Sequence, residues 1–94
     1  MILVGKRLLT DFARKHATAR DAIAAWTLEV ETAGWRSGAD VKARFASVSF
    51  VGNDRLVFNL KGNHFRLDVQ VGYSAQIVLV RRIGTHAEYD SWTF

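Results

Sequence analysis

The hydrophobic pattern around Gly62-Asn63 constrains the fold of this chain more than any other feature. Alternating apolar and polar residues flank this pair, and glycine tolerates the positive φ that a two-residue hairpin turn requires. A turn at 62–63 pairs residues 55–61 with residues 64–70, and directly opposed side chains share one face of a sheet. The predicted apolar face consists of Leu56, Phe58, Leu60, Phe65, Leu67 and Val69. The predicted polar face consists of Arg55, Asn59, Lys61, His64, Arg66, Asp68 and Gln70, with Val57 as its one apolar member.

The N-terminal half has the spacing of helices rather than strands. We predict an edge strand over residues 2–8, followed by a helix that begins at Thr10. Thr18 is expected to be the N-cap of a second helix and Gly34 its C-cap, and Asp40 is expected to cap a short helical turn. The second helix has an apolar stripe with helical spacing, made of Ala22, Ile23, Trp26, Val30 and Ala33.

The C-terminal half continues the sheet. Residues 64–72 and 76–83 are predicted strands joined near Ser74-Ala75, and the second of them is apolar on both faces, as in a central strand. The capping box Thr85-x-x-Glu88 predicts a short final helix. The expected fold is a single α+β domain over residues 1–94, with an N-terminal strand and two helices packed on an antiparallel sheet and a short C-terminal helix.

The chain carries a formal net charge of +4 and no cysteine. The lack of cysteine excludes disulfides and cysteine-ligated metals, and the positive charge favours nucleic acid, an acidic protein or an anionic membrane as partner. The charge is concentrated in the predicted strands, because Asp68 is the only acid between positions 55 and 84. The cations of this stretch are Arg55, Lys61, Arg66, Arg81 and Arg82.

The N-terminus gives no reason to expect a membrane partner. Its apolar run, residues 1–4, is interrupted by Gly5, Lys6 and Arg7, and is too short for a signal peptide or a membrane span. We therefore expect a cytoplasmic protein.

The polar sheet face is one candidate for chemistry. Cleavage of RNA without a metal needs a base for the 2′-hydroxyl, an acid for the leaving 5′-oxygen and cations for the phosphate. Arg66 suits the phosphate because its planar fork matches two phosphate oxygens, and Lys61 and His64 lie beside it at the hairpin end. The alternative, which position alone favours, is a solvated sheet face on which Arg66 only pairs with Asp68 or with water. In both cases we expect Arg66 to be exposed, so that its loss costs little stability.

Residues 85–90 are the second candidate. His86 and Tyr89 are three residues apart and share a helical face, and both side chains can transfer protons. Asp90 is placed to hold the His86 ring. The alternative is that these residues only build the last helix, with Trp92 and Phe94 anchoring the C-terminus. The histidine spacings match no zinc signature, so we expect no metal and no cofactor.

Two of these segments carry a family resemblance. Val57-Phe58-Asn59-Leu60-Lys61-Gly62-Asn63-His64-Phe65-Arg66-Leu67 is similar to the signature VFNI-x-GN-x-YRL of HigB-type mRNA interferase toxins. Ile83-Gly84-Thr85-His86-Ala87-Glu88-Tyr89-Asp90 resembles the closing THAEYD motif of the same family. Phe65 replaces the usual tyrosine, and by parity it points to the core, so we expect little effect on catalysis.

The resemblance implies a RelE-like fold, metal-independent cleavage of mRNA on the ribosome, and neutralisation by a HigA-type helix-turn-helix antitoxin. Operator DNA would be bound only through that antitoxin. Arg66, His86 and Tyr89 would be the catalytic residues. The expected RNA-binding residues are Lys61, Asn63, His64, Arg55, Arg81 and Arg82.

Two other classes of function remain compatible with the residues alone. One is an RNA-binding or ribosome-binding module that holds phosphates without cutting. The other is a protein-binding subunit whose basic face complements an acidic partner. Growth arrest on expression in bacteria favours the enzyme, because a binder that does not cut is expected to be much less toxic.

Overall fold

The predicted hairpin forms the middle of the sheet in the computed structural model, which describes residues 1–94. β3 (Arg55–Leu60) and β4 (Phe65–Gly72) are antiparallel, and all pairs predicted from Arg55–Gln70 to Leu60–Phe65 are present. The turn differs in detail, because positive φ occurs at Lys61 and Gly62 rather than at Gly62 and Asn63. Lys61 and His64 are part of this turn, where the His64 N–H donates to the Lys61 carbonyl over 3.3 Å.

The sheet is mixed, with the strand order β1-β5-β4-β3-β2. β5 (Ile77–Thr85) is central, as predicted, and pairs antiparallel with β4. β1 (Ile2–Val4) lies at one edge as predicted, and it runs parallel to β5, so the sheet is mixed rather than antiparallel throughout. The short β2 (Ser49–Phe50) forms the other edge.

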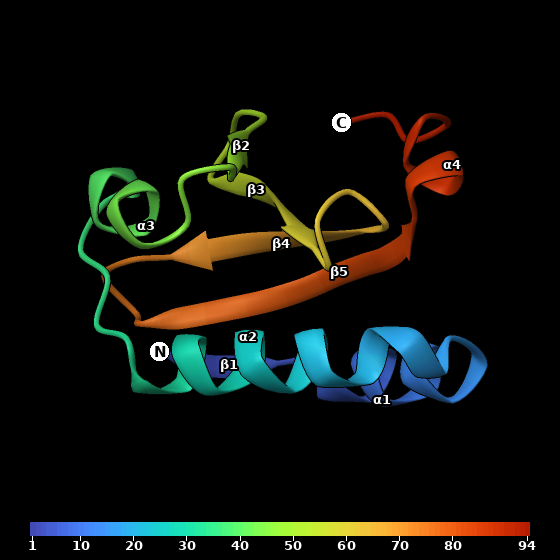
Figure 1. Cartoon of the computed structure of the whole chain (residues 1–94). Helices are drawn as coiled ribbons and strands as arrows, with labels where there is room; N and C mark the ends of the chain where they lie inside the picture. Colours follow the sequence, from blue (N-terminus) through green and yellow to red (C-terminus); the bar gives the residue numbers. More distant parts are fainter.

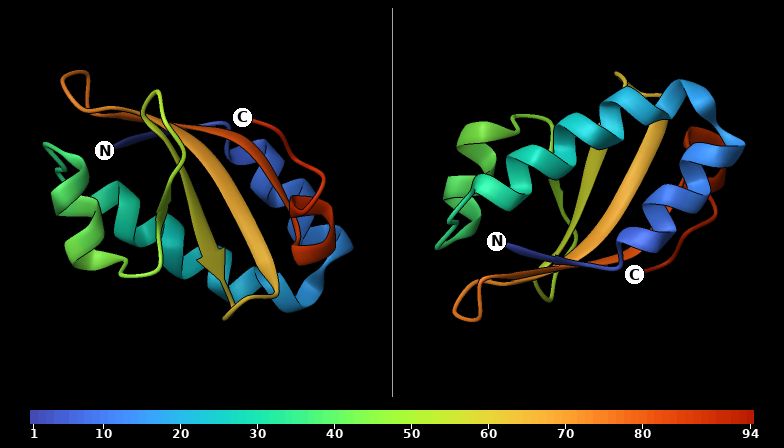
Figure 2. Two further views of the ribbon diagram at one scale, coloured as in Figure 1. Left: turned by 90° about the horizontal axis from the view of Figure 1, so that it is seen from above. Right: turned by 90° about the horizontal axis from the view of Figure 1, so that it is seen from below.

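Two helices cover one face of this sheet, α1 (Lys6–Lys15) and α2 (Arg20–Thr32), and the 3-10 turn η1 (Ala17–Ala19) joins them. Figures 1 and 2 show both helices lying along the same side of the strands. α3 (Gly38–Arg44) lies near the start of the hairpin, and α4 (His86–Tyr89) lies at the far end of β5.

The predicted first strand is too long, and the first helix begins earlier than Thr10. The reason is Gly5, which has a φ of 93° and turns the chain directly from β1 into α1. A Cβ atom on Gly5 would lie 3.1 Å from the Val80 carbonyl oxygen, so this residue also lets the turn lie against β5.

The other predicted helix ends also shift. Thr18 lies inside η1 and caps nothing, because Ala19 is the N-cap of α2. α2 ends before Gly34, with Ala33 as its extended C-cap. Asp40 lies in the first turn of α3, where its carboxylate accepts the Arg36 N–H over 2.8 Å.

The predicted apolar face is confirmed. All six of its side chains are buried in the core cluster, together with Ile23, Trp26 and Val30 of α2. The rings of Trp26 and Phe58 meet edge to face at 5.4 Å between centroids. The core therefore fills the space between the hairpin and the two helices.

The polar face of the hairpin is not an open, solvated surface. Val57, Arg66 and Asp68 are all buried on it. α4 and the C-terminal residues fold back over this side of the sheet (Figure 1), where the Tyr89 ring lies beside Arg66 and Trp92 lies beside Arg82, a partner of Asp68. The expectation of an exposed Arg66 was wrong for this reason.

No helix in the structure is long and apolar enough to cross a membrane.

Candidate active site

Arg66 lies near the turn end of β4, on the polar face of the hairpin. It is opposite Asn59 on β3 and Gly84 on β5. Only 8% of the residue is exposed. Its Nη1 donates to the Asn63 carbonyl over 3.0 Å, so the hairpin turn curls back and holds the guanidinium in place.

The other contacts of Arg66 come from α4. Nη2 of Arg66 lies 2.9 Å from Nδ1 of His86, and the guanidinium carbon lies 5.2 Å from the centroid of the Tyr89 ring. His86 and Tyr89 therefore flank the same cation, as their spacing on one helical face predicted. No carboxylate forms an ion pair with Arg66.

The contact between Arg66 and His86 fixes the tautomer of the histidine. An arginine side chain has only donors, so Nδ1 accepts and the single proton of the neutral imidazole is on Nε2. The prediction that Asp90 holds this ring was wrong, because the Asp90 carboxylate forms no hydrogen bond or ion pair with the imidazole. Asp90 contacts His86 only through a backbone bond, in which its N–H donates to the His86 carbonyl over 3.4 Å.

α4 is fixed at its start by the predicted capping box. The Thr85 hydroxyl accepts the Glu88 N–H over 3.2 Å, and the Glu88 carboxylate accepts the Thr85 N–H over 2.9 Å. Hydrogen bonding to the Glu88 carboxyl, from the Thr85 backbone N–H first and from the Thr85 side chain second, lowers the pKa of Glu88 below its ordinary value of 4.5. The His86 N–H also donates to the His64 carbonyl over 3.0 Å, which ties α4 to the hairpin turn.

An open hollow of about 550 Å³ lies between the hairpin turn and the start of α4. Its lining residues are Asn63, His64, Phe65, Thr85, His86 and Ala87. Phe65 contributes to the lining but is buried in the core, as the alternation of side chains along the strand predicted. The hollow gives a ligand access to His86 beside the buried Arg66.

A second polar group lies further along the same face and centres on Asp68, which is fully buried. Nε of Arg55 donates to Asp68 over 3.1 Å, and Nε of Arg82 donates to it over 2.8 Å. The Arg82 guanidinium carbon lies 4.6 Å from the Trp92 ring centroid and 4.9 Å from that of Phe94. The C-terminal residues are thus fastened to the sheet, and Trp92 and Phe94 are the anchors that the sequence predicted.

The predicted site residues therefore fall into three sets. Arg66, His86 and Tyr89 come together, with the Asn63 carbonyl and the His64 carbonyl holding them. Arg55 and Arg82 share Asp68 elsewhere on the face. The exposed residues Lys61 and Arg81 contact neither set through an ion pair.

Sequence reasoning missed two residues that shape the site. The sequence marked Asp68 as the only acid of its segment and as a possible partner of Arg66, whereas its role as the shared partner of Arg55 and Arg82 needs the fold. A Cβ on Gly84 would lie 2.8 Å from the Trp92 ring and 3.2 Å from Glu88. Glycine there lets α4 and the C-terminal residues pack over β5.

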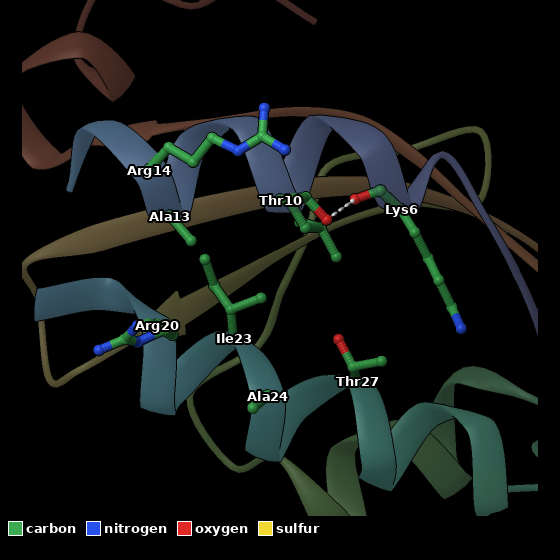
Figure 3. Close-up of a pocket in the computed structure, with 9 residues that line it drawn as sticks. Lys6, Thr10, Ala13, Arg14, Arg20, Ile23, Ala24 and Thr27 are labelled. Atoms are coloured by element: carbon green, nitrogen blue, oxygen red, sulfur yellow. Dashed lines mark hydrogen bonds between the residues drawn. The ribbon is translucent and has the colours of Figure 1, made fainter. Parts of the chain in front are cut away.

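A groove between α1 and α2 is the other sizeable hollow, with a volume of about 390 Å³ (Figure 3). Leu9, Ala13 and Ile23 are among its lining residues, and its charged groups are Lys6, Arg14 and Arg20. It contains no histidine and no carboxylate. The groups that can transfer protons beside a buried arginine, His86 and Tyr89, lie on the other side of the sheet, which makes that side the candidate site.

A comparison with known protein families matches the segment that contains these site residues. The sequence model of the HigB toxin, the RelE-like toxic component of a toxin–antitoxin system, matches residues 19–92, which include the hairpin, Arg66 and α4. The chain belongs to the HigB toxin family. It is thus the toxin of a toxin–antitoxin system.

Individual HigB relatives match over nearly the whole chain. The mRNA interferase toxin HigB of Escherichia coli K12 is 30% identical over 95 aligned residues, which cover 99% of this chain and 91% of the relative. Proteins named mRNA interferase HigB from Escherichia coli O157:H7 and Shigella flexneri match with the same identity and coverage. The resemblance predicted from the two motifs is confirmed.

Proposed function

We propose that this chain is an endoribonuclease that cuts mRNA, with Arg66, His86 and Tyr89 as its catalytic residues. The observation that carries the proposal is the environment of Arg66. A buried guanidinium without a carboxylate partner is costly, and here its neighbours are two side chains that can transfer protons. The names of the HigB relatives state the same substrate, mRNA.

The proposed reaction needs no metal in its chemical step. The 2′-oxygen of the RNA loses its proton to a base and bonds to the adjacent phosphorus, while the bond to the 5′-oxygen breaks. The 5′-oxygen takes a proton from an acid, leaving a 2′,3′-cyclic phosphate and a 5′-hydroxyl. His86 and Tyr89 are the two proton-transfer groups, and Arg66 stabilises the charge on the phosphate oxygens.

The Arg66–His86 hydrogen bond indicates how the RNA phosphate would bind at this site. A phosphate that accepts hydrogen bonds from Arg66 competes with Nδ1 of His86 for the same donor. The charged acceptor is the stronger one, so the phosphate releases the imidazole for proton transfer. The hollow beside His86 receives the RNA, with Lys61, Asn63 and His64 as supporting contacts.

We further propose that cutting takes place on translating ribosomes in the cytoplasm, and that a HigA-type antitoxin with a helix-turn-helix domain neutralises the toxin. Membership of a toxin–antitoxin family supports an antitoxin partner. Operator DNA would be bound through that antitoxin alone.

Induction of the chain in bacteria tests the proposal. We expect rapid growth arrest and new 5′ ends inside mRNA coding regions, both suppressed when the antitoxin is expressed as well. Growth arrest without new 5′ ends would instead support a ribosome-binding protein that does not cut. Normal growth with abundant folded protein would contradict the proposal.

A further inference from the structure

A β-bulge in β5 brings two consecutive arginines to one place. Asp68 pairs with Arg82 and Val69 pairs with Val80, so Arg81 has no partner on β4. Bulges re-aim side chains that otherwise alternate between the faces of a sheet. Arg81 and Arg82 accordingly line the same cavity of about 260 Å³, together with Arg55 and Thr93. We call this the arginine cavity.

The arginine cavity has an excess of positive charge. Two of its three guanidinium groups, those of Arg55 and Arg82, share the single carboxylate of Asp68, and Arg81 forms no ion pair. Arg55 and Arg82 reach Asp68 through Nε and Nη2 of Arg55 and Nε of Arg82. Nη1 of each of these two arginines bonds no acceptor in the protein, so both have donors left for a ligand.

Two of these cations are already fixed in position. Arg82 is held by Asp68, by the Thr93 carbonyl at 2.8 Å and by the rings of Trp92 and Phe94. Arg55 is held by Asp68 and lies 5.5 Å from the Phe94 ring centroid. Groups that are ordered before binding lose less conformational entropy when a ligand arrives. The arginine cavity therefore combines hydrogen-bond donors fixed in position with an excess of positive charge. This combination is suited to binding an oxyanion.

We propose that the arginine cavity binds a second phosphate of the RNA, separate from the phosphate at Arg66, and that Arg81 supplies its free charge. The Asp68–Arg82 pair lies two residues along the strands from the Arg66–Gly84 pair, a separation of roughly 7 Å. A single strand seated at Arg66 can therefore continue along the same face into the cavity. The identification of the phosphate as one belonging to RNA depends on the proposed function.

Binding measurements on the whole protein test this site without requiring cleavage. The first probe is a fully 2′-O-methylated single-stranded RNA, which lacks the attacking hydroxyl, and the second is purified ribosomes carrying mRNA. Each is titrated with wild type, Arg81→Ala, Arg81→Lys and Arg20→Ala over a range of salt concentrations. Arg20 is the matched control, because it is an exposed arginine of α2, on the opposite side of the sheet.

We expect Arg81→Ala to weaken binding severalfold and to lower the slope of log Kd against log salt by about 0.7, the loss of one phosphate contact to a single strand. Arg81→Lys should restore most of the slope, and Arg20→Ala should match wild type. An effect on the oligonucleotide assigns the phosphate to the strand that is cut, whereas an effect on ribosomes alone would contradict this assignment and place the phosphate in ribosomal RNA.

Equal behaviour of Arg81→Ala and Arg20→Ala on both probes would overturn the proposed cavity site while leaving the function of Arg66 intact. If wild type binds neither probe, both proposals fail. If Arg81→Ala binds weakly but Arg66→Ala and His86→Ala still cut mRNA, the phosphate site stands and the proposed catalytic residues are wrong.

Discussion

Nη2 of Arg66 donates to Nδ1 of His86 over 2.9 Å, so the cation of β4 and the histidine of α4 form one unit. The unit joins the two segments whose sequences resemble HigB toxins, and the Tyr89 ring lies against its guanidinium group. Its three side chains have the chemical properties that RNA cleavage by a neighbouring 2′-hydroxyl requires.

Tyr89→Phe tests the contribution of the phenolic hydroxyl separately from that of the aromatic ring. The substitution keeps the ring beside Arg66 and removes only the group that can transfer a proton. We expect the cleavage rate to fall by about 10²-fold, and His86→Ala to lower it by a similar or greater factor. Single-turnover cleavage of mRNA on ribosomes measures both. A wild-type rate for Tyr89→Phe would restrict Tyr89 to packing against Arg66.

The end groups of the cut RNA report the bond that is formed. Attack by the 2′-hydroxyl leaves a 2′,3′-cyclic phosphate upstream and a 5′-hydroxyl downstream. Ligation methods that distinguish 5′-hydroxyl from 5′-phosphate ends should recover only the former directly at the cut sites. Recovery of 5′-phosphate ends there points to attack by water and rules out the proposed chemistry.

Asp68→Asn should destabilise the protein through the C-terminal residues. The change leaves Arg55 and Arg82 without their shared charge, and breaking a buried ion pair from one side typically costs about 3 kcal/mol. Urea unfolding should give a lower midpoint than wild type. Since Arg82 also holds Trp92 and Phe94, α4 is expected to loosen and cleavage to slow. An unchanged midpoint would mean that the aromatic contacts alone fasten this segment.

Acid should weaken the start of α4. The pKa of Glu88 is lowered in the folded protein, so the stability that its charge contributes is fully present above pH 4.5 and is lost as the pH falls through the folded-state value. Glu88→Gln should remove this part of the pH dependence of unfolding. Thr85→Ala should lower stability by about 1 kcal/mol at neutral pH, because it removes the N-cap. Identical pH profiles for wild type and Glu88→Gln would contradict this role.

The sequence was sufficient to predict the hairpin, because alternation on both sides of a glycine turn, broken only at Val57, determines register and faces together. It also predicted that His86 and Tyr89 share a face, since helical spacing is local. It could not reveal the burial of Arg66, which depends on α4 folding back over β4.

Two further features depend on tertiary structure in the same way. The pairing of Asp68 with Arg55 and Arg82 joins three strands, and only one of these contacts lies within the predicted hairpin. The early start of α1 follows from the close approach of Gly5 to Val80, which belongs to a strand far along the chain. Local patterns carry no signal for either contact.

The burial of Arg66 changes what its replacement should do. Arg66→Ala removes packing against the hairpin turn and Tyr89, so some loss of stability is expected in addition to the loss of a phosphate contact. Arg66→Lys retains a charge but cannot reproduce the two-pronged geometry of the guanidinium. The two variants together separate the charge from the geometry, and the melting temperature controls for folding.

The rate of mRNA cleavage by folded Arg66→Ala protein is the most direct test of the proposed active site. Loss of one transition-state contact of this kind costs about 3 kcal/mol, so the rate should fall roughly a hundredfold or more. The measurement is made below the melting temperature of the variant, with retained antitoxin binding as evidence of the native fold. A folded variant that cuts mRNA at the wild-type rate would remove Arg66 from the active site and contradict the proposed mechanism.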